Sequence, residues 1–359
     1  MKINFIVPGI YKSGGMRAIV EIAKGLSSLG NEVRLYYPSI PFNSFPGEYT
    51  WNSLRNYYWD LKTFSYNKNN LDYFVSNSAE ICRVSSISDK FIEDADFVIA
   101  TGWQTVNSVL NLRGSKGYKI YFIQDYENWR GNINAIDETY SKDLFGITTC
   151  KHLHDLIKQK FGIETEIIYY GVDLEIFKNP NKTIKKKKTV TFINHSAQKK
   201  NTEAALEIVN RIKRKFPQTH IKSFGIMPYN DLPSYIENYV NPSESKIVEI
   251  LCNTDIFIYT SKVEGFGMPP SEAMACKAAV ISSNVGAIPE YCRHGIDGFI
   301  FEPDDIDGFT SQIEKLLTND DILLKTSLNG YERISSFLNW KEAVFKWNNL
   351  LHKLKSEYD

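Results

Sequence analysis

The feature that most constrains this fold is a strand, a glycine-rich loop and a helix that follow one another between residues 255 and 278. The run DIFIYTSKV is apolar enough for a buried strand, EGFGMPPSE (264–272) predicts the loop, and SEAMACKA favours a helix. A strand that continues into a helix pairs in parallel with the next strand. Ligands of open parallel sheets bind where such strands end. The segment therefore predicts an α/β fold with a ligand site at this edge.

The residue types in this loop suit a nucleotide-sugar. Gly265 and Gly267 allow the backbone to approach a ligand closely and to turn sharply. The proline pair 269–270 fits the first turn of a helix, whose N–H groups and positive dipole end attract a diphosphate. Glu272, expected in that first turn, can accept hydrogen bonds from a ribose diol, and Glu264 from a sugar hydroxyl. The alternative is a purely structural helix start in which Glu272 complements the dipole.

Strand and helix patterns alternate along the chain in two series. The first predicts strands at 2–9, 31–38, 97–101, 119–124, 147–150 and 166–173, and helices at 16–30, 103–112 and 152–162. The second predicts strands at 189–194, 220–225, 255–263, 279–283 and 298–302, and helices at 202–216, 246–254 and 305–317. Each series builds a doubly wound sheet. Residues 40–80 lack clear periodicity, and we interpret them as an irregular insert that faces an acceptor.

These patterns predict two Rossmann-like domains that face each other across a cleft. The expected domains are 1–172 and 173–335, and the polar run LEIFKNPNKTIKKKK after Asp173 is the best linker candidate. The segment 336–359 is expected to form a helix that packs back on the N-terminal domain. Its apolar stripe consists of Trp340, Val344, Trp347, Leu351 and Leu354.

Bulk properties exclude several classes of protein. A chain of 359 residues with 43% hydrophobic content can bury two cores. Its formal net charge of zero argues against a dedicated nucleic-acid binder. The five cysteines have neither metal-binding nor disulfide spacing. No signal peptide or apolar run of about 18 residues is recognisable. These observations predict a soluble, cytoplasmic protein.

Several segments resemble the retaining glycosyltransferases of family 4, which have the GT-B fold. The longest is VEGFGMPPSEAMACKAAVISSNVGAIPEYCRHGIDGFIFEPDD, residues 263–305. YYGVD at 169–173 resembles the interdomain crossover of that family. ATGWQT and FIQDYENW, at 100–105 and 122–129, resemble a subgroup that includes bacterial rhamnosyltransferases and other cell-surface polysaccharide enzymes. The resemblance implies transfer of a hexosyl or deoxyhexosyl group from a UDP-, GDP- or dTDP-sugar to a glycan or lipid-linked acceptor.

The resemblance also implies roles for individual residues. Glu272 would bind the donor ribose and Glu264 the transferred sugar, while Lys200, with Lys199 as second candidate, would neutralise the diphosphate. The backbone of one loop would hold donor oxygens, and these residues are Gly265, Phe266, Gly267 and Met268. Gly14 and Gly15 resemble the N-terminal glycine loop of the family.

This chain departs from the family pattern at two places. Where an arginine often precedes the phosphate-binding lysine, the chain has Asn194 and His195. Where many members carry a histidine near the sugar, it has Gln124, followed by Asp125 and Glu127. Gln124 can bond a sugar hydroxyl but cannot carry a proton, and the two acids are equally compatible with ordinary loop polarity. We assign Gln124 and Asp125, with Glu264, to the catalytic side of the site.

The expected chemistry needs no metal ion and no cofactor besides the donor. Asp94 and Asp96 have the spacing of a metal-binding pair but precede a strand, at the wrong end of a parallel sheet. Front-face attack, in which the departing phosphate oxygen takes the acceptor proton, fits better than double displacement because no carboxylate stands out as nucleophile. A nucleotide-sugar epimerase and a non-catalytic sugar-nucleotide-binding protein are the alternatives. With membranes we expect at most transient contact, at the inner face.

Overall fold

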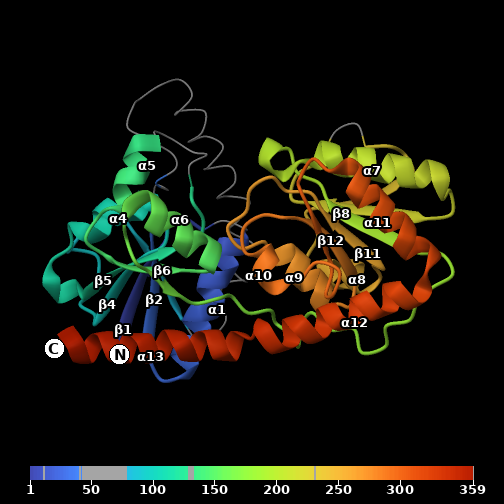
Figure 1. Ribbon diagram of the computed structural model, residues 1–359. Coiled ribbons are helices and arrows are strands. Elements are labelled where there is room, and N and C mark those ends of the chain that lie inside the picture. Colours follow the sequence, from blue (N-terminus) through green and yellow to red (C-terminus); the bar gives the residue numbers. More distant parts are fainter. Residues whose placement is uncertain (11–12, 40–41, 43–78, 128–132, 230–231, 359) are drawn as a thin grey trace. The chain divides into compact units, whose positions relative to one another are not determined.

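The chain divides into two compact units, which are described separately (Figure 1). The computed structural model describes residues 1–10, 13–39, 42, 79–127, 133–229 and 232–358. Unit 1 contains Met1–Tyr170 and Trp340–Asp359, and unit 2 contains Gly171–Asn339. The insert predicted at 40–80 lies outside the described residues except for residues 42, 79 and 80.

Unit 1 is built on a seven-stranded parallel sheet with the order β3-β2-β1-β4-β5-β6-β7. Its strands are β1 Lys2–Ile6, β2 Glu32–Pro38, β3 Glu80–Val84, β4 Phe97–Ala100, β5 Tyr118–Ile123, β6 Phe145–Thr148 and β7 Glu166–Ile167. Its helices are α1 Gly14–Ser28, α4 Trp103–Leu110, the 3-10 turn η3 Gly114–Lys116, α5 Ile133–Tyr140, α6 Lys151–Phe161 and α13 Trp340–Tyr358. Helices α1 and α13 lie on one face of the sheet, and α4 and α6 on the other (Figure 1).

Unit 2 is built on a six-stranded parallel sheet with the order β10-β9-β8-β11-β12-β13. Its strands are β8 Thr189–Ile193, β9 His220–Gly225, β10 Ile236–Val240, β11 Ile256–Tyr259, β12 Ala279–Ser283 and β13 Phe299–Phe301. Its helices are η4 Gln198–Lys200 (3-10), α7 Thr202–Lys215, α8 Glu244–Cys252, α9 Met268–Ala275, α10 Ile288–Tyr291, α11 Ile306–Thr318 and α12 Asp320–Phe337. Figure 1 shows α7 and α11 on one face of this sheet and α8 and α9 on the other.

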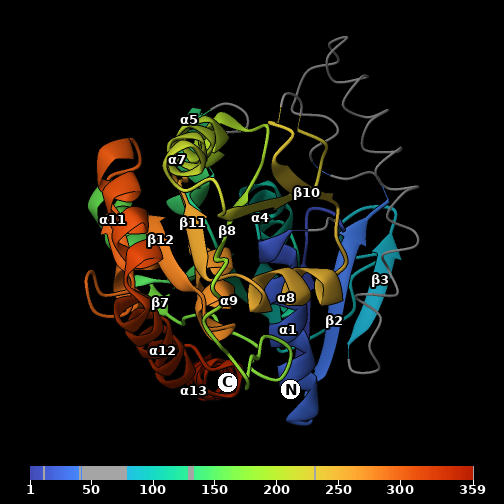
Figure 2. The ribbon, with the colours of Figure 1, turned by 90° about the vertical axis from the view of Figure 1, so that its right-hand side faces the viewer.

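Both sheets reverse their winding direction at one place, as a doubly wound fold requires. In unit 1 the strand order turns between β1 and β4, and in unit 2 between β8 and β11. Figure 2 shows β8 and β11 side by side. In doubly wound folds the loops that follow such strands diverge to opposite faces of the sheet, and ligands bind at the carboxyl edge between them. The predicted doubly wound architecture is confirmed.

Helix α13 packs against α1, which confirms the expectation that the last helix returns to the N-terminal domain. Trp347 of the predicted stripe is fully buried, with its ring centroid 5.0 Å from that of Phe122 and 6.3 Å from that of Phe5. Lys355 adds an ion pair with Asp96 at 2.6 Å.

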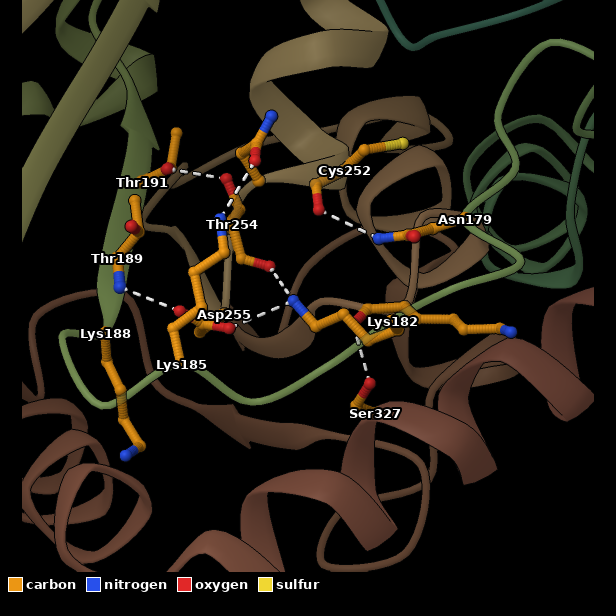
Figure 3. A network of polar contacts seen from close by, with 12 residues as sticks. Asn179, Lys182, Lys185, Lys188, Thr189, Thr191, Cys252, Thr254, Asp255 and Ser327 are labelled. Atoms are coloured by element: carbon orange, nitrogen blue, oxygen red, sulfur yellow. Dashed lines mark hydrogen bonds and ion pairs between the residues drawn. The ribbon is translucent and has the colours of Figure 1, made fainter.

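The polar segment after Asp173, which its composition marks as a linker, is anchored to unit 2 (Figure 3). Lys182 Nζ donates to the Thr254 carbonyl at 2.6 Å and pairs with Asp255 at 3.1 Å. The side chains of Lys182 and Asp255 are only 4% and 3% exposed. The second carboxylate oxygen of Asp255 accepts from the backbone N–H of Thr189, the first residue of β8. A buried ion pair therefore fixes this segment against the amino ends of β8 and β11.

The structure differs from the sequence prediction at several elements. The strand predicted at 166–173 is only two residues long, because after Ile167 a single further bond, from Ile168 N–H to the Thr148 carbonyl, continues the pairing. Among the strands and α-helices that the structure describes, β3, β10, α5, α10 and α12 were not predicted. The buried face of α12 explains its absence from the prediction, since it combines Thr326, Ser327 and Gly330 with only two large apolar residues.

Candidate functional site

The strongest candidate site lies at the carboxyl edge of the unit 2 sheet, at its switch point. The loop after β8 carries Lys199 and Lys200 in the turn η4, and the loop after β11 carries Glu264. Lys262 N–H donates to the Lys199 carbonyl at 2.7 Å, and the Ser261 hydroxyl lies 3.0 Å from the same oxygen. The two loops that sequence analysis assigned to the donor are therefore in direct contact.

The segment that contains Gly286 and Tyr291 packs against the glycine-rich loop. Gly286 has φ +57°, and a Cβ atom there would stand 2.5 Å from the carbonyl oxygens of Glu264 and Gly265. Tyr291 donates its hydroxyl to the Gly267 carbonyl at 2.5 Å, and its ring stacks on Phe266 at 5.7 Å. Phe266 is buried, so only its backbone could meet a ligand.

Helix α9 begins with Gly267 as its N-cap, in the left-handed conformation at φ +78°. The proline pair 269–270 occupies the first turn, as predicted. Proline has no N–H, so the amide donors that this helix start can offer belong to Gly267 and Met268. Glu272 is the fifth residue of the helix, which corrects the prediction that it lies in the first turn. Glu272 lies on the second turn of α9 and is 8% exposed.

Glu264 is the centre of a compact polar cluster. One carboxylate oxygen, Oε1, lies 2.5 Å from Lys200 Nζ, 2.6 Å from the Tyr259 hydroxyl and 2.6 Å from the Ser261 hydroxyl. Lys200 Nζ also lies 3.3 Å from the Tyr259 hydroxyl. The side chains of Lys200 and Glu264 are 25% and 12% exposed. A cation and a carboxylate are thus held together at the carboxyl edge of the sheet.

Burial and neighbouring charges set the protonation state of the groups around this cluster. Burial, and then the charge of Glu264, raise the pKa of Tyr259 well above its usual range, so its hydroxyl keeps its proton and donates. Burial lowers the pKa of His195, and Lys200 and Lys199 lower it further. His195 is therefore neutral near pH 7. The Asn194 side chain is buried and donates to Asn238 at 2.7 Å, so neither residue at the missing-arginine position supplies charge.

The residues predicted in the N-terminal domain gather at the carboxyl edge of the unit 1 sheet. Gly14 and Gly15 are the first residues of α1 rather than loop residues, and a Cβ atom on Gly15 would stand 3.1 Å from Gln124 Oε1. Gln124 Oε1 accepts from the Tyr170 hydroxyl at 2.6 Å, and Gln124 Nε2 donates to the Thr101 carbonyl at 3.2 Å. Both ends of the Gln124 amide are thereby oriented.

Asp125 follows Gln124 at the same edge. Its backbone carbonyl accepts from the Tyr140 hydroxyl at 3.2 Å. The same tyrosine hydroxyl also accepts from the N–H of Glu127 at 3.2 Å. The residues predicted for catalysis thus fall into two groups, Glu264 in unit 2 and Gln124 with Asp125 in unit 1.

Asp94 and Asp96 lie at the opposite, amino edge of the unit 1 sheet, before β4. Asp94 pairs with Lys116 at 2.7 Å and Asp96 with Lys355 at 2.6 Å. No group of three or more His, Cys, Asp and Glu side chains suited to a metal ion occurs among the residues that the structure describes. Within the same residues, no helix is both long and apolar enough to span a bilayer.

Four residues of the site were not found by sequence reasoning, namely Tyr259, Ser261, Gly286 and Tyr291. Tyr259 and Ser261 flank the end of β11, and a strand pattern does not tell which way the last side chains point. Gly286 and Tyr291 belong to the block 263–305, whose length was the available signal.

The fold defines the class of protein. Two doubly wound parallel sheets, with a last helix that returns to the first unit, constitute the GT-B fold. The structure of Anabaena HepE in complex with UDP and glucose has this fold, with a TM-score of 0.76 at 14% identity over 98% of this chain and 100% of that chain.

Sequence comparison finds a similarity within the C-terminal unit. Residues 173–333 match the family described as "Glycosyl transferases group 1". O-antigen chain mannosyltransferase B of Escherichia coli is 41% identical over 133 residues, which are 37% of this chain and 30% of that protein. The serotype-specific mannosyltransferase WbdA of E. coli is 33% identical over 97 residues, which are 27% of this chain and 11% of that protein. The matched segments thus span a minor part of both relatives.

Proposed function

We propose that this protein is a retaining, metal-independent glycosyltransferase of family 4. It moves a hexosyl or deoxyhexosyl group from a nucleotide-diphosphate sugar to a glycan or lipid-linked saccharide in surface polysaccharide assembly. The observation that carries this proposal is the meeting of Lys200, Glu264 and the start of α9 at the switch point of unit 2. A diphosphate needs a cation and amide donors, and a sugar needs carboxylate acceptors, and this edge supplies all of them.

In this proposal the donor lies along the carboxyl edge of unit 2. Lys200 binds the diphosphate, with Lys199 as a weaker second contact, and the amides of Gly267 and Met268 bind phosphate oxygens. Glu272 accepts the ribose diol from the second turn of α9, and Glu264 accepts a hydroxyl of the transferred sugar. Support for a nucleotide-sugar donor comes from the HepE complex with UDP and glucose and from the two relatives named as mannosyltransferases.

The reaction uses electrostatic stabilisation of the leaving group. Positive potential from Lys200 and the start of α9 stabilises the departing diphosphate, and each preorganised donor contributes about 3 kcal/mol in a dry site. The departing phosphate oxygen takes the proton of the acceptor hydroxyl as that hydroxyl attacks from the same face. Gln124 in unit 1 cannot carry a proton, which suits a mechanism without a strong protein base. Unit 1, with Gln124, Asp125 and the start of α1, receives the acceptor at the inner face of the membrane.

A panel of UDP-, GDP- and dTDP-sugars tests this proposal. We expect one donor to release free nucleoside diphosphate at a rate that rises with added glycan or lipid-linked acceptor, without added metal and in the presence of EDTA. Appearance of an epimerised sugar-nucleotide without acceptor would instead identify an epimerase. Tight binding of a nucleotide-sugar with neither outcome would identify a non-catalytic binding protein. The Glu272→Ala variant serves as control, because its release should fall in proportion to lost donor binding.

A further inference from the structure

Tyr259, at the end of β11, differs from Phe257, the other aromatic residue of its strand. The residue is 5% exposed, and its ring stacks on Phe257 at 6.4 Å inside unit 2. Its hydroxyl, however, reaches the polar cluster, where it lies 2.6 Å from Glu264 Oε1 and 3.3 Å from Lys200 Nζ. Lys200 Nζ also lies 5.8 Å from the centre of the Tyr259 ring. One side chain thus touches both partners of the ion pair.

The bonds around Glu264 are unevenly distributed between its two carboxylate oxygens. Lys200, Tyr259 and Ser261 all approach Oε1, and a carboxylate oxygen has room for about two good donors. Among the described residues, none donates a hydrogen bond to Oε2. Oε1 is therefore fully occupied, and Oε2 is the acceptor that remains for a ligand.

We propose that Tyr259 is a positioning residue that fixes the Glu264 carboxylate, so that Oε2 accepts a hydroxyl of the transferred sugar while Oε1 stays bound to Lys200. This inference rests on the proposed transferase function and deepens it. The ligand at Oε2 is a hexose or deoxyhexose with a free hydroxyl at the contacted position. A sugar in which that hydroxyl is replaced by hydrogen or methoxy leaves Oε2 without a donor and is rejected.

The chemistry of a buried phenol suits this task. A tyrosine in a rigid strand has few rotatable bonds, and its hydroxyl donates one hydrogen bond in a fixed direction. Phenylalanine would fill the same space without the donor. The Ser261 hydroxyl cannot replace the Tyr259 hydroxyl as a fixed donor to Glu264, because it also lies within hydrogen-bond distance of the carbonyls of Lys199 and Val263. Without the Tyr259 hydroxyl, Glu264 can rotate about its side-chain bonds, and Lys200 loses its second contact.

The test is the variant Tyr259→Phe, with nucleotide binding and transfer measured separately. We expect kcat to fall about 10- to 100-fold, as is typical for a misplaced reacting group. The Kd of the bare nucleoside diphosphate should change less than about threefold, because the diphosphate and ribose contacts remain. The affinity advantage of the sugar-nucleotide over the bare nucleotide should shrink in the same variant. A merely structural role of Tyr259 would change both affinities together.

Tyr235→Phe is the matched control. It removes a half-buried phenol hydroxyl in the same unit, where Tyr235 donates to Asn210 of α7, and it should keep wild-type kcat. Wild-type kcat in Tyr259→Phe would overturn the positioning role while the transferase proposal stands. Absence of transfer by the wild-type protein with every donor would instead overturn the proposed function itself, and the positioning role with it.

Discussion

The role of Lys200 can be tested by replacing it with methionine, which keeps the length of the side chain and removes its charge. Lys200 pairs with Glu264 at 2.5 Å, and the two side chains are 25% and 12% exposed. Two unit charges about 4 Å apart attract each other with about 4 kcal/mol at an effective dielectric constant near 20. Partial exposure and the cost of desolvation reduce the net contribution of this pair to stability to about 1–2 kcal/mol.

The same arithmetic applies to a diphosphate that lies beside Lys200. With a similar reduction for solvent, the lysine should contribute about 2–3 kcal/mol to binding, which corresponds to a Kd increase of about 30- to 150-fold in Lys200→Met. Isothermal titration calorimetry with nucleoside diphosphates at low and high salt measures this change. The salt dependence should also weaken in the variant, because one counterion contact is lost.

Lys199→Met is the matched control, since the two lysines are adjacent in the turn η4. The backbone carbonyl of Lys199 accepts from Ser261 and from the N–H of Lys262 in the loop after β11, and methionine preserves these bonds. Its affinity for the nucleotide should fall less than about fivefold, in line with a solvent-screened charge. A Kd within threefold of wild type in Lys200→Met, or a larger loss in Lys199→Met, would refute the assignment of Lys200.

Three further predictions concern the same edge. Gly286→Ala should lower the free energy of unfolding by about 1–3 kcal/mol and weaken nucleotide binding, because its Cβ would meet two loop carbonyls. Gly295→Ala, at φ +76° with open space around it, should lower only the free energy of unfolding, and by less. Thermal shift measured with and without nucleotide separates the two variants. Burial and then Lys200 lower the pKa of His195, and the charge of a bound diphosphate should raise that pKa again. Nucleotide binding should therefore be coupled to proton uptake by His195 below about pH 6.5, and its affinity should increase there. Equal pH dependence of Kd in the wild-type protein and in His195→Gln would contradict this. Glu272→Ala should weaken nucleotide binding about 10- to 100-fold through lost charged hydrogen bonds, whereas Glu264→Ala should mainly slow transfer; titration and initial rates should therefore rank the two variants in opposite order.

The sequence predicted the sheets well where strands are interior. Runs such as DIFIYTS and TVTFIN are buried on both faces, so nearly every residue is apolar, and the strand period is not needed to find them. The edge strand β10 reads IENYV, with partial burial at three of its five positions, and it escaped prediction for that reason. Helix α12 was missed because its buried face is largely small and polar.

The candidate site was predicted in its residue types but not in its detailed geometry. The pair Glu264 and Glu272 and the lysines at 199–200 lie on the loops and helix that the pattern indicated. The contact of Tyr259 with Glu264 could not be predicted from the sequence, because a strand pattern indicates burial but not the direction in which a hydroxyl points. Lys182 shows the same limit: it lies in a polar run, and nothing in its neighbours signals a partner 73 residues further along the chain.

The most direct test of the central claim is a crystal structure of this protein with the nucleoside diphosphate that it binds most tightly. The account predicts phosphate oxygens within hydrogen-bond distance of Lys200 Nζ and the Met268 N–H, and ribose hydroxyls on the Glu272 carboxylate. The Oε1 oxygen of Glu264 should still be held by Tyr259. A nucleotide bound elsewhere, or bound at this edge with its diphosphate turned away from Lys200 and α9, would contradict the account.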